Sequence, residues 1–125
     1  MAVFTISDLH LSLNSNKSME IFEGWENYVQ KLKKNWTKTV GAEDTVIIIG
    51  DVSWAMKIEE SYDDLKFINE LPGKKIIIKG NHDFWWNTIS KVNEFIEKNN
   101  FNTISILYNT ATEVDGVCIC GTRGW

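Results

Sequence analysis

The sequence predicts an α/β domain in which a βαβαβ parallel sheet carries helices on both faces and is followed by an antiparallel set of strands. Short apolar runs that do not alternate with polar residues indicate buried strands, and stretches with helical periodicity separate the first three of them. After residue 102 the apolar runs follow one another without helical stretches between them, which favours antiparallel pairing. The length of 125 residues and the hydrophobic content of 43% match one domain with a single core.

The first two predicted strands are separated by one helix. Residues 2–6 (AVFTI) and 45–49 (TVIII) are short, apolar and rich in β-branched side chains, as buried strands are. Between them, apolar residues recur at steps of three and four, which predicts an amphipathic helix. Ser18 is its expected N-cap, and Gly41 marks its expected end.

A second helix and a third strand follow. The apolar residues of the stretch 58–71 have helical spacing, and the Pro-Gly pair at 72–73 ends that helix. Residues 75–79 (KIIIK) form the third expected strand. A third helix is expected to turn Ile89 and Val92 inward.

The C-terminal part of the chain consists of three further apolar runs. Residues 103–107, 110–114 and 117–121 are expected to be strands, and Asp115-Gly116 is typical of a two-residue hairpin turn. These strands are expected to make the sheet antiparallel.

Composition excludes several classes of protein. A net charge of -4 with scattered basic residues does not predict a nucleic-acid partner. The N-terminus lacks a basic region and a long apolar run, so no signal peptide or membrane helix is expected, and the protein is interpreted as cytoplasmic. Cys118 and Cys120 lie two positions apart on one strand face, which favours two buried thiols over a disulfide.

Side chains of the kinds that bind metals follow each of the first three predicted strands. They are Asp8 and His10 after the first, Asp51 after the second, and Asn81, His82 and Asp83 after the third. Because ligands of parallel α/β sheets bind beyond the carboxyl ends of the strands, these side chains are expected to meet. Carboxylate, imidazole and amide groups together suit Mn²⁺, Fe²⁺ or Zn²⁺ better than Ca²⁺.

Each of these residues also has an ordinary structural role available to it. Asn81 and Asp83 could cap the next helix, and Asp8 or Asp51 could stabilise a turn. The convergence of three strand ends, with the only two histidines of the chain among them, favours a shared site.

The segments "DLH", "GD" and "GNHD", in this order and at these spacings, resemble the calcineurin-like metallophosphoesterase superfamily. "GDVSWAM" and "KGNHDFWW" are similar to a bacterial branch of predicted phosphoesterases. The resemblance implies a four-layer αββα sandwich. It also implies that phosphomonoesters or phosphodiesters are hydrolysed by a hydroxide bound to two divalent metals, with a small phosphate ester as the partner.

The resemblance also implies roles for single residues. Asp8 and His10 would bind one metal, Asp51 would bridge the two metals, and Asn81 would bind the second. His82 would protonate the leaving oxygen.

By the same resemblance, Asp83 would orient His82. Four further residues are candidate substrate contacts, although packing is the commoner role for large aromatic side chains. They are Trp54, Trp85, Trp86 and Arg123.

The chain departs from the family pattern in its C-terminal part. No histidine follows His82, whereas the family continues with a further His and a Gly-His-x-His segment. Residues 1–125 are therefore expected to be a metallophosphoesterase-type domain truncated at its C-terminus. The chain could instead be a short protein that completes its site with a second chain, as a homodimer through an open sheet edge. It could also be a non-catalytic module that binds metal or phosphate.

A receiver-like signalling domain is the alternative from another class. It shares the length, the alternating strands and helices and the acidic strand ends. It would require an acidic pair after the first strand, where this chain has Asp8 and His10, and the antiparallel C-terminal strands do not fit it.

Overall fold

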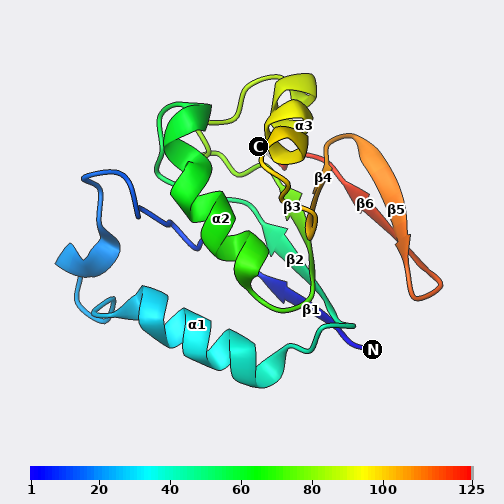
Figure 1. Ribbon diagram of the computed structural model, residues 1–125, viewed down its shortest axis with the longest axis horizontal. Helices are drawn as coiled ribbons and strands as arrows, with labels where there is room; N and C mark the ends of the chain where they lie inside the picture. The colour runs from blue at the N-terminus through cyan, green and yellow to red at the C-terminus, as the bar shows by residue number, and fades with distance from the viewer. Residues whose placement is uncertain (125) are drawn as a thin grey trace.

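The computed structural model describes residues 1–124 and contains a four-stranded parallel sheet (Figure 1). Helices connect successive strands, so the strand order β1-β2-β3-β4 follows the sequence. The strands are β1 (Val3–Ile6), β2 (Thr45–Ile49), β3 (Lys74–Ile78) and β4 (Ile104–Leu107), and the helices are α1 (Tyr28–Thr39), α2 (Tyr62–Glu70) and α3 (Ile89–Lys98). None of these helices is both long and apolar enough to span a bilayer.

The helix whose expected N-cap is Ser18 begins nine residues later than expected, with Asn27 as its N-cap. Ser18 caps only η1, a 3-10 turn over Met19–Ile21, by accepting a hydrogen bond from the backbone N–H of Glu20. Gly24 and Asn27 then have φ values of 90° and 54°, which no α-helix accommodates. The expected helix was therefore wrong in its N-terminal part, and α1 starts at Tyr28.

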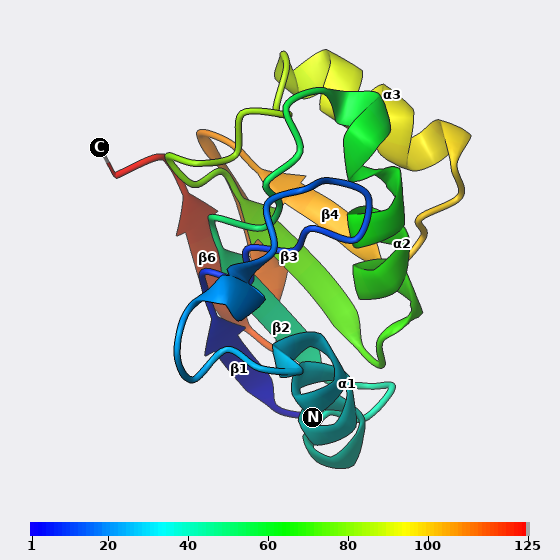
Figure 2. The ribbon, with the colours of Figure 1, turned by 90° about the vertical axis from the view of Figure 1, so that its left-hand side faces the viewer.

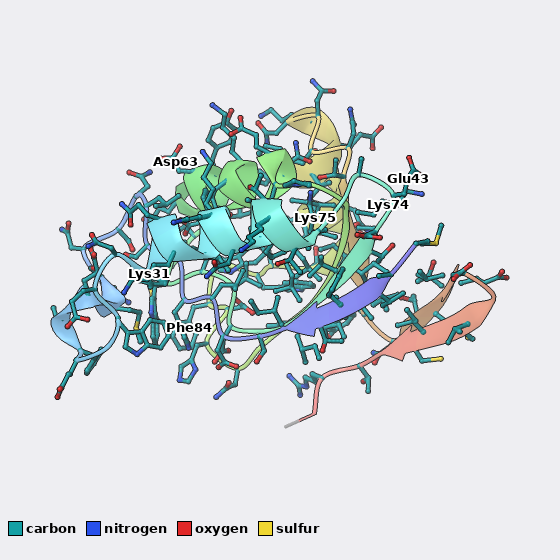
Figure 3. The ribbon with its side chains drawn as sticks, turned by 90° about the horizontal axis from the view of Figure 1, so that it is seen from below. Lys31, Glu43, Asp63, Lys74, Lys75 and Phe84 are labelled. Atoms are coloured by element: carbon teal, nitrogen blue, oxygen red, sulfur yellow. The ribbon has the colours of Figure 1, made fainter. Side chains whose placement is uncertain are left out.

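Lys75 links the end of α2 to β3. It is fully buried, and its Nζ donates hydrogen bonds to the carbonyl oxygens of Asn69, Leu71 and Gly73 (Figure 3). A helix leaves its last carbonyl groups without partners, and a cation is stabilising at the C-terminus because this is the negative end of the helix dipole. Burial lowers the pKa of Lys75 to about 8.

All three helices lie on the same face of the sheet. Trp36 of α1, Leu65 of α2 and Val92 of α3 pack in one core cluster with Ile48 and Ile77 from the strands. Figure 2 shows the helices on one side of the sheet and strands β5 and β6 on the other. The expectation of helices on both faces was therefore wrong, because the C-terminal hairpin occupies the second face.

The hairpin is formed by β5 (Thr110–Val114) and β6 (Val117–Gly121), which pair antiparallel in a sheet of their own. Their turn residues, Asp115 and Gly116, have φ values of 50° and 79°, as a two-residue hairpin of this kind requires. Val114 and Ile119 pack against residues from the second face of the main sheet.

The strand at 103–107 does not belong to the antiparallel set. β4 pairs parallel with β3, with Lys75 opposite Ile104. The helix α3 lies between β3 and β4, so the chain returns to the same end of the sheet before β4 starts. Among the described residues, 1–124, the antiparallel strands are therefore only β5 and β6.

The two cysteines are exposed, which corrects the expectation of buried thiols. Their sulfur atoms lie 3.8 Å apart on one face of β6, as the spacing predicted. The hairpin packs against the main sheet through its opposite face, which carries Ile119, so the cysteine face is left in solvent.

Candidate metal centre

The loops after β1 and β2 run side by side. The backbone N–H of Asp8 donates to the carbonyl of Gly50 at 3.1 Å, and that of His10 donates to the carbonyl of Asp51 at 2.9 Å. The parallel pairing then continues to a bridge between Leu11 and Ser53. The sheet therefore extends into the two loops and fixes the positions of their side chains.

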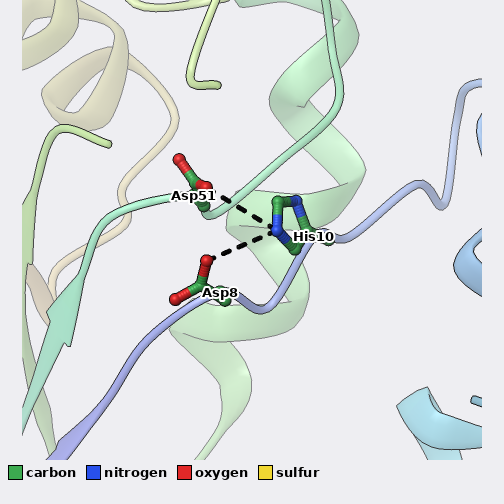
Figure 4. Close-up of side chains that lie close together, drawn as sticks. All are labelled: Asp8, His10 and Asp51. Carbon is green, nitrogen blue, oxygen red and sulfur yellow. Dashed lines mark ion pairs between the residues drawn. The ribbon is translucent and has the colours of Figure 1, made fainter. Parts of the chain in front are cut away.

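Three residues in these loops adopt the left-handed backbone conformation. Asp8, His10 and Asp51 have φ values of 57°, 43° and 51°. Residues with a Cβ atom rarely adopt this conformation, and it concentrates at functional sites, where the surrounding structure holds it. All three side chains turn toward one another (Figure 4).

The three side chains form a cluster of possible metal ligands. His10 Nε2 lies 3.5 Å from Asp8 Oδ1 and 3.6 Å from Asp51 Oδ2. One ligand atom from each residue falls within 4.8 Å of the others. Among residues 1–124 no lysine comes within 4.0 Å of either carboxylate. Two carboxylates and one imidazole match the donors that a divalent transition metal prefers.

Two glycines bring the third loop against this cluster. A Cβ atom on Gly80 would lie 2.1 Å from the backbone nitrogen of Asp51 and 2.3 Å from its Oδ1. A Cβ atom on Gly50 would lie 2.6 Å from the Cα of Gly80. Only glycines permit this close approach of the two loops.

His82 is held by Asp51. Its backbone N–H donates to Asp51 Oδ1 at 2.9 Å, and its ring Nδ1 lies 2.9 Å from Asp51 Oδ2. Burial pushes the pKa of Asp51 upward, but the hydrogen bonds from His82 and the nearby His10 bring it below its ordinary range. Asn81 is exposed and lies between Gly80 and His82 in the chain, and its role as a ligand stays a prediction.

Asp83 was expected to orient His82, but its carboxylate makes four other hydrogen bonds. Oδ1 accepts from the backbone N–H groups of Val52 and Ser53 and from the indole of Trp85, and Oδ2 accepts from the N–H of Gly80. The residue is 1% exposed. Burial raises the pKa of Asp83, and the four hydrogen bonds act in the opposite direction. Asp83 therefore joins the second loop to the third instead of holding the imidazole.

A second buried carboxylate, Asp64 of α2, joins the first loop to the second. It accepts a hydrogen bond from the N–H of Leu13 at 2.9 Å and one from the hydroxyl of Ser53 at 2.5 Å. Burial raises the pKa of Asp64. Sequence reasoning missed this residue, since an acid in the first turn of a helix is ordinarily explained by the helix dipole.

α1 also contacts the site. The hydroxyl of Tyr28 donates to the carbonyl of His10 at 2.6 Å, and burial is the main cause that raises the pKa of Tyr28 to about 12. The phenol therefore stays protonated at neutral pH and holds the backbone of His10 in place.

Trp54 is the only one of the three predicted tryptophan contacts that lies at the site surface. Its ring stacks on that of His10 with centroids 4.7 Å apart. Trp85 and Trp86 are 2% and 7% exposed in the core, which agrees with packing, the commoner role, and not with substrate contact. Arg123 is exposed after β6, and its contact with substrate stays a prediction.

Comparisons with known proteins match this chain to one family and to a similar fold. The family model "Calcineurin-like phosphoesterase" matches residues 1–123. The Gene 66 protein of Mycobacterium phage L5 is 38% identical over 80 residues, which are 62% of this chain and 37% of the phage protein. A protein of unknown function from Aquifex aeolicus has a similar fold, with a TM-score of 0.53 and 23% identity over 94% of this chain and 58% of its own. The chain thus spans less than two thirds of either relative.

Proposed function

Since this chain belongs to the calcineurin-like phosphoesterase family, we propose that it takes part in the hydrolysis of phosphate esters, with divalent metal ions bound by Asp8, His10 and Asp51. The observation that carries the proposal is the convergence of these three side chains from two adjacent loops. A metal ion there would lower the pKa of a bound water toward about 7 and so provide a nucleophile at neutral pH.

We propose that residues around this cluster bind a second metal ion. Asp51, which contacts both His10 and His82, is the proposed ligand shared by two ions, and Asn81 is a proposed ligand of the second. Mn²⁺, Fe²⁺ and Zn²⁺ are the proposed ions, because the donors include imidazole as well as carboxylate.

His82 is the proposed proton donor to the leaving oxygen. Asp51 engages its Nδ1, which leaves Nε2 as the ring atom that can exchange a proton with a substrate. The side chain is 43% exposed, so a small phosphate ester can reach it. Proton transfer by a positioned side chain typically contributes about 10²–10⁴ in rate.

The test measures metal binding and turnover on the same samples. Mn²⁺ is titrated into the 125-residue chain by calorimetry, and hydrolysis of p-nitrophenyl phosphate and bis(p-nitrophenyl) phosphate is followed at each Mn²⁺ concentration. Asp51→Asn removes the charge of the shared ligand. Asp115→Asn is the matched control, because Asp115 has the same left-handed backbone, with φ 50°, at the exposed hairpin turn.

We expect Mn²⁺-dependent turnover in the wild type and in Asp115→Asn, and its loss in Asp51→Asn together with weaker Mn²⁺ binding. Mn²⁺ binding without turnover in any sample would favour a metal-binding module that does not catalyse hydrolysis. Failure of the folded wild-type chain to bind Mn²⁺ would refute the proposal.

A further inference from the structure

A groove of about 400 Å³ lies beside the metal centre, between the segment that carries η1 and Trp54. Its apolar lining comes from Met19, Ile21, Phe22 and Trp54. Ile21 and Phe22 are 80% and 53% exposed, although both are large apolar side chains. Adjacent exposed apolar side chains of this kind commonly mark a binding site.

Trp54 connects the groove to the metal centre. Its indole ring lines the groove and also stacks on the ring of His10, with an interplanar angle of 21°. A molecule whose charged end binds at the metal ligands could therefore place its other end in the groove by crossing one indole ring. The ring centroids of His10 and Trp54 lie 4.7 Å apart, so a molecule that reaches from the metal ligands past the indole ring into the groove requires an organic group of several carbon atoms.

Lys17 supplies a positive charge on the same side. Its Nζ lies 6.0 Å from the centroid of the Trp54 ring and 3.2 Å from the sulfur of Met56. Within residues 1–124, no carboxylate lies within 4.0 Å of this Nζ. The groove thus combines an apolar surface with a cation that lacks an acidic partner, which complements an apolar molecule that carries a phosphate.

We propose that this groove binds the apolar organic group of the phosphate ester substrate, with Lys17 supplying a positive charge that favours an anionic ligand. The inference rests on the proposed function and adds the substrate class, namely phosphate esters of an apolar alcohol. Small polar alcohols such as glycerol would leave the groove empty.

Alkylphosphonates of increasing chain length test this inference, because they resemble phosphate esters and are not hydrolysed. Binding of methyl-, butyl- and hexylphosphonate is measured by calorimetry on the Mn²⁺-loaded chain and on the metal-free chain. Each methylene that enters the groove should strengthen binding about fourfold. Since the first carbons span the Trp54 ring, we expect hexylphosphonate to bind about tenfold more tightly than methylphosphonate.

Two phenylalanines provide a matched pair of variants. Phe22 and Phe84 are 53% and 51% exposed, and Phe84 makes a T-shaped contact with the ring of His82 and does not line the groove. Phe22→Ala should reduce the tenfold chain-length effect to about threefold, and Phe84→Ala should retain it. Lys17→Ala should weaken the binding of all three phosphonates by a similar factor.

Three results would overturn the inference. These are equal affinity for methyl- and hexylphosphonate, an unchanged chain-length effect in Phe22→Ala, or its loss in Phe84→Ala alone. In each of these cases Mn²⁺-dependent binding of methylphosphonate would still support the proposed function. If no phosphonate binds in a Mn²⁺-dependent manner, both the inference and the proposed function fail.

Discussion

Replacement of Asp83 by Asn tests whether its carboxylate holds the second and third loops together. Asn keeps one oxygen for the three donors that now bond to Oδ1, but its NH₂ group would face the N–H of Gly80, which donates to Oδ2 at 2.7 Å. One charge-assisted hydrogen bond is lost, and the others become weaker because the acceptor is neutral. Since a hydrogen bond to a charged group contributes about 1.5–3 kcal/mol, we expect the free energy of unfolding to fall by about 3 kcal/mol.

Urea unfolding followed by circular dichroism measures this loss, and the melting temperature should fall by roughly 10 °C. Asp63→Asn is the control, because Asp63 is exposed in the first turn of α2 and its replacement should change the stability by no more than about 0.5 kcal/mol. Supporting residues around metal ligands commonly change affinity by about 10–100-fold, so Mn²⁺ should also bind at least tenfold more weakly to Asp83→Asn. Stability and Mn²⁺ affinity equal to those of Asp63→Asn would refute the role assigned to this carboxylate.

Two further predictions concern Gly80 and Lys75. Gly80→Ala should abolish Mn²⁺ binding measured by calorimetry, because its Cβ would lie 2.1 Å from the backbone nitrogen of Asp51. Gly124→Ala is the control, because its Cβ would meet no atom within 4 Å, and it should bind Mn²⁺ as the wild type does. Mn²⁺ binding by Gly80→Ala would contradict the close approach of the two loops. Burial lowers the pKa of Lys75 from 10.5 to about 8, so the unfolded chain binds more protons than the folded chain between these two pH values. The free energy of unfolding should therefore rise with pH across this window, by at most about 3 kcal/mol. Urea titrations at about pH 7.5 to 10 measure this slope, which Lys75→Met should remove; identical slopes in the two proteins would show that Lys75 is not the group responsible.

The sequence predicted the strands well because their composition leaves little choice. Residues 45–49 and 110–114 form strands at the predicted bounds, and Asp115-Gly116 forms the predicted turn. The direction of β4 was predicted wrongly, because pairing direction depends on how the chain returns to the sheet and not on the residues of the strand itself. The start of α1 was missed because apolar spacing continues through Gly24, where the backbone is not helical.

The candidate ligands were predicted from the sequence for a topological reason. Strand ends of a parallel sheet meet at one edge, so Asp8, His10 and Asp51 could be grouped before their distances were known. The partners of the buried acids could not be predicted in this way. Asp83 accepts hydrogen bonds from backbone N–H groups of another loop, and Asp64 reaches the site from a helix. Neither contact produces a pattern in the amino-acid sequence.

The parallel register of β1 and β2 places Val3 beside Thr45, so the two ligand-bearing loops are brought together across the whole α1 crossover. No short peptide from this chain contains the cluster, because its ligands are brought together by long-range contacts that form slowly and are lost cooperatively. A metal ion bound there would stabilise the entire sheet against unfolding, by about 2.7 kcal/mol when its free concentration is about a hundred times its dissociation constant. Amide hydrogens in β1, far along the chain from Asp51, would then exchange more slowly when the metal is added.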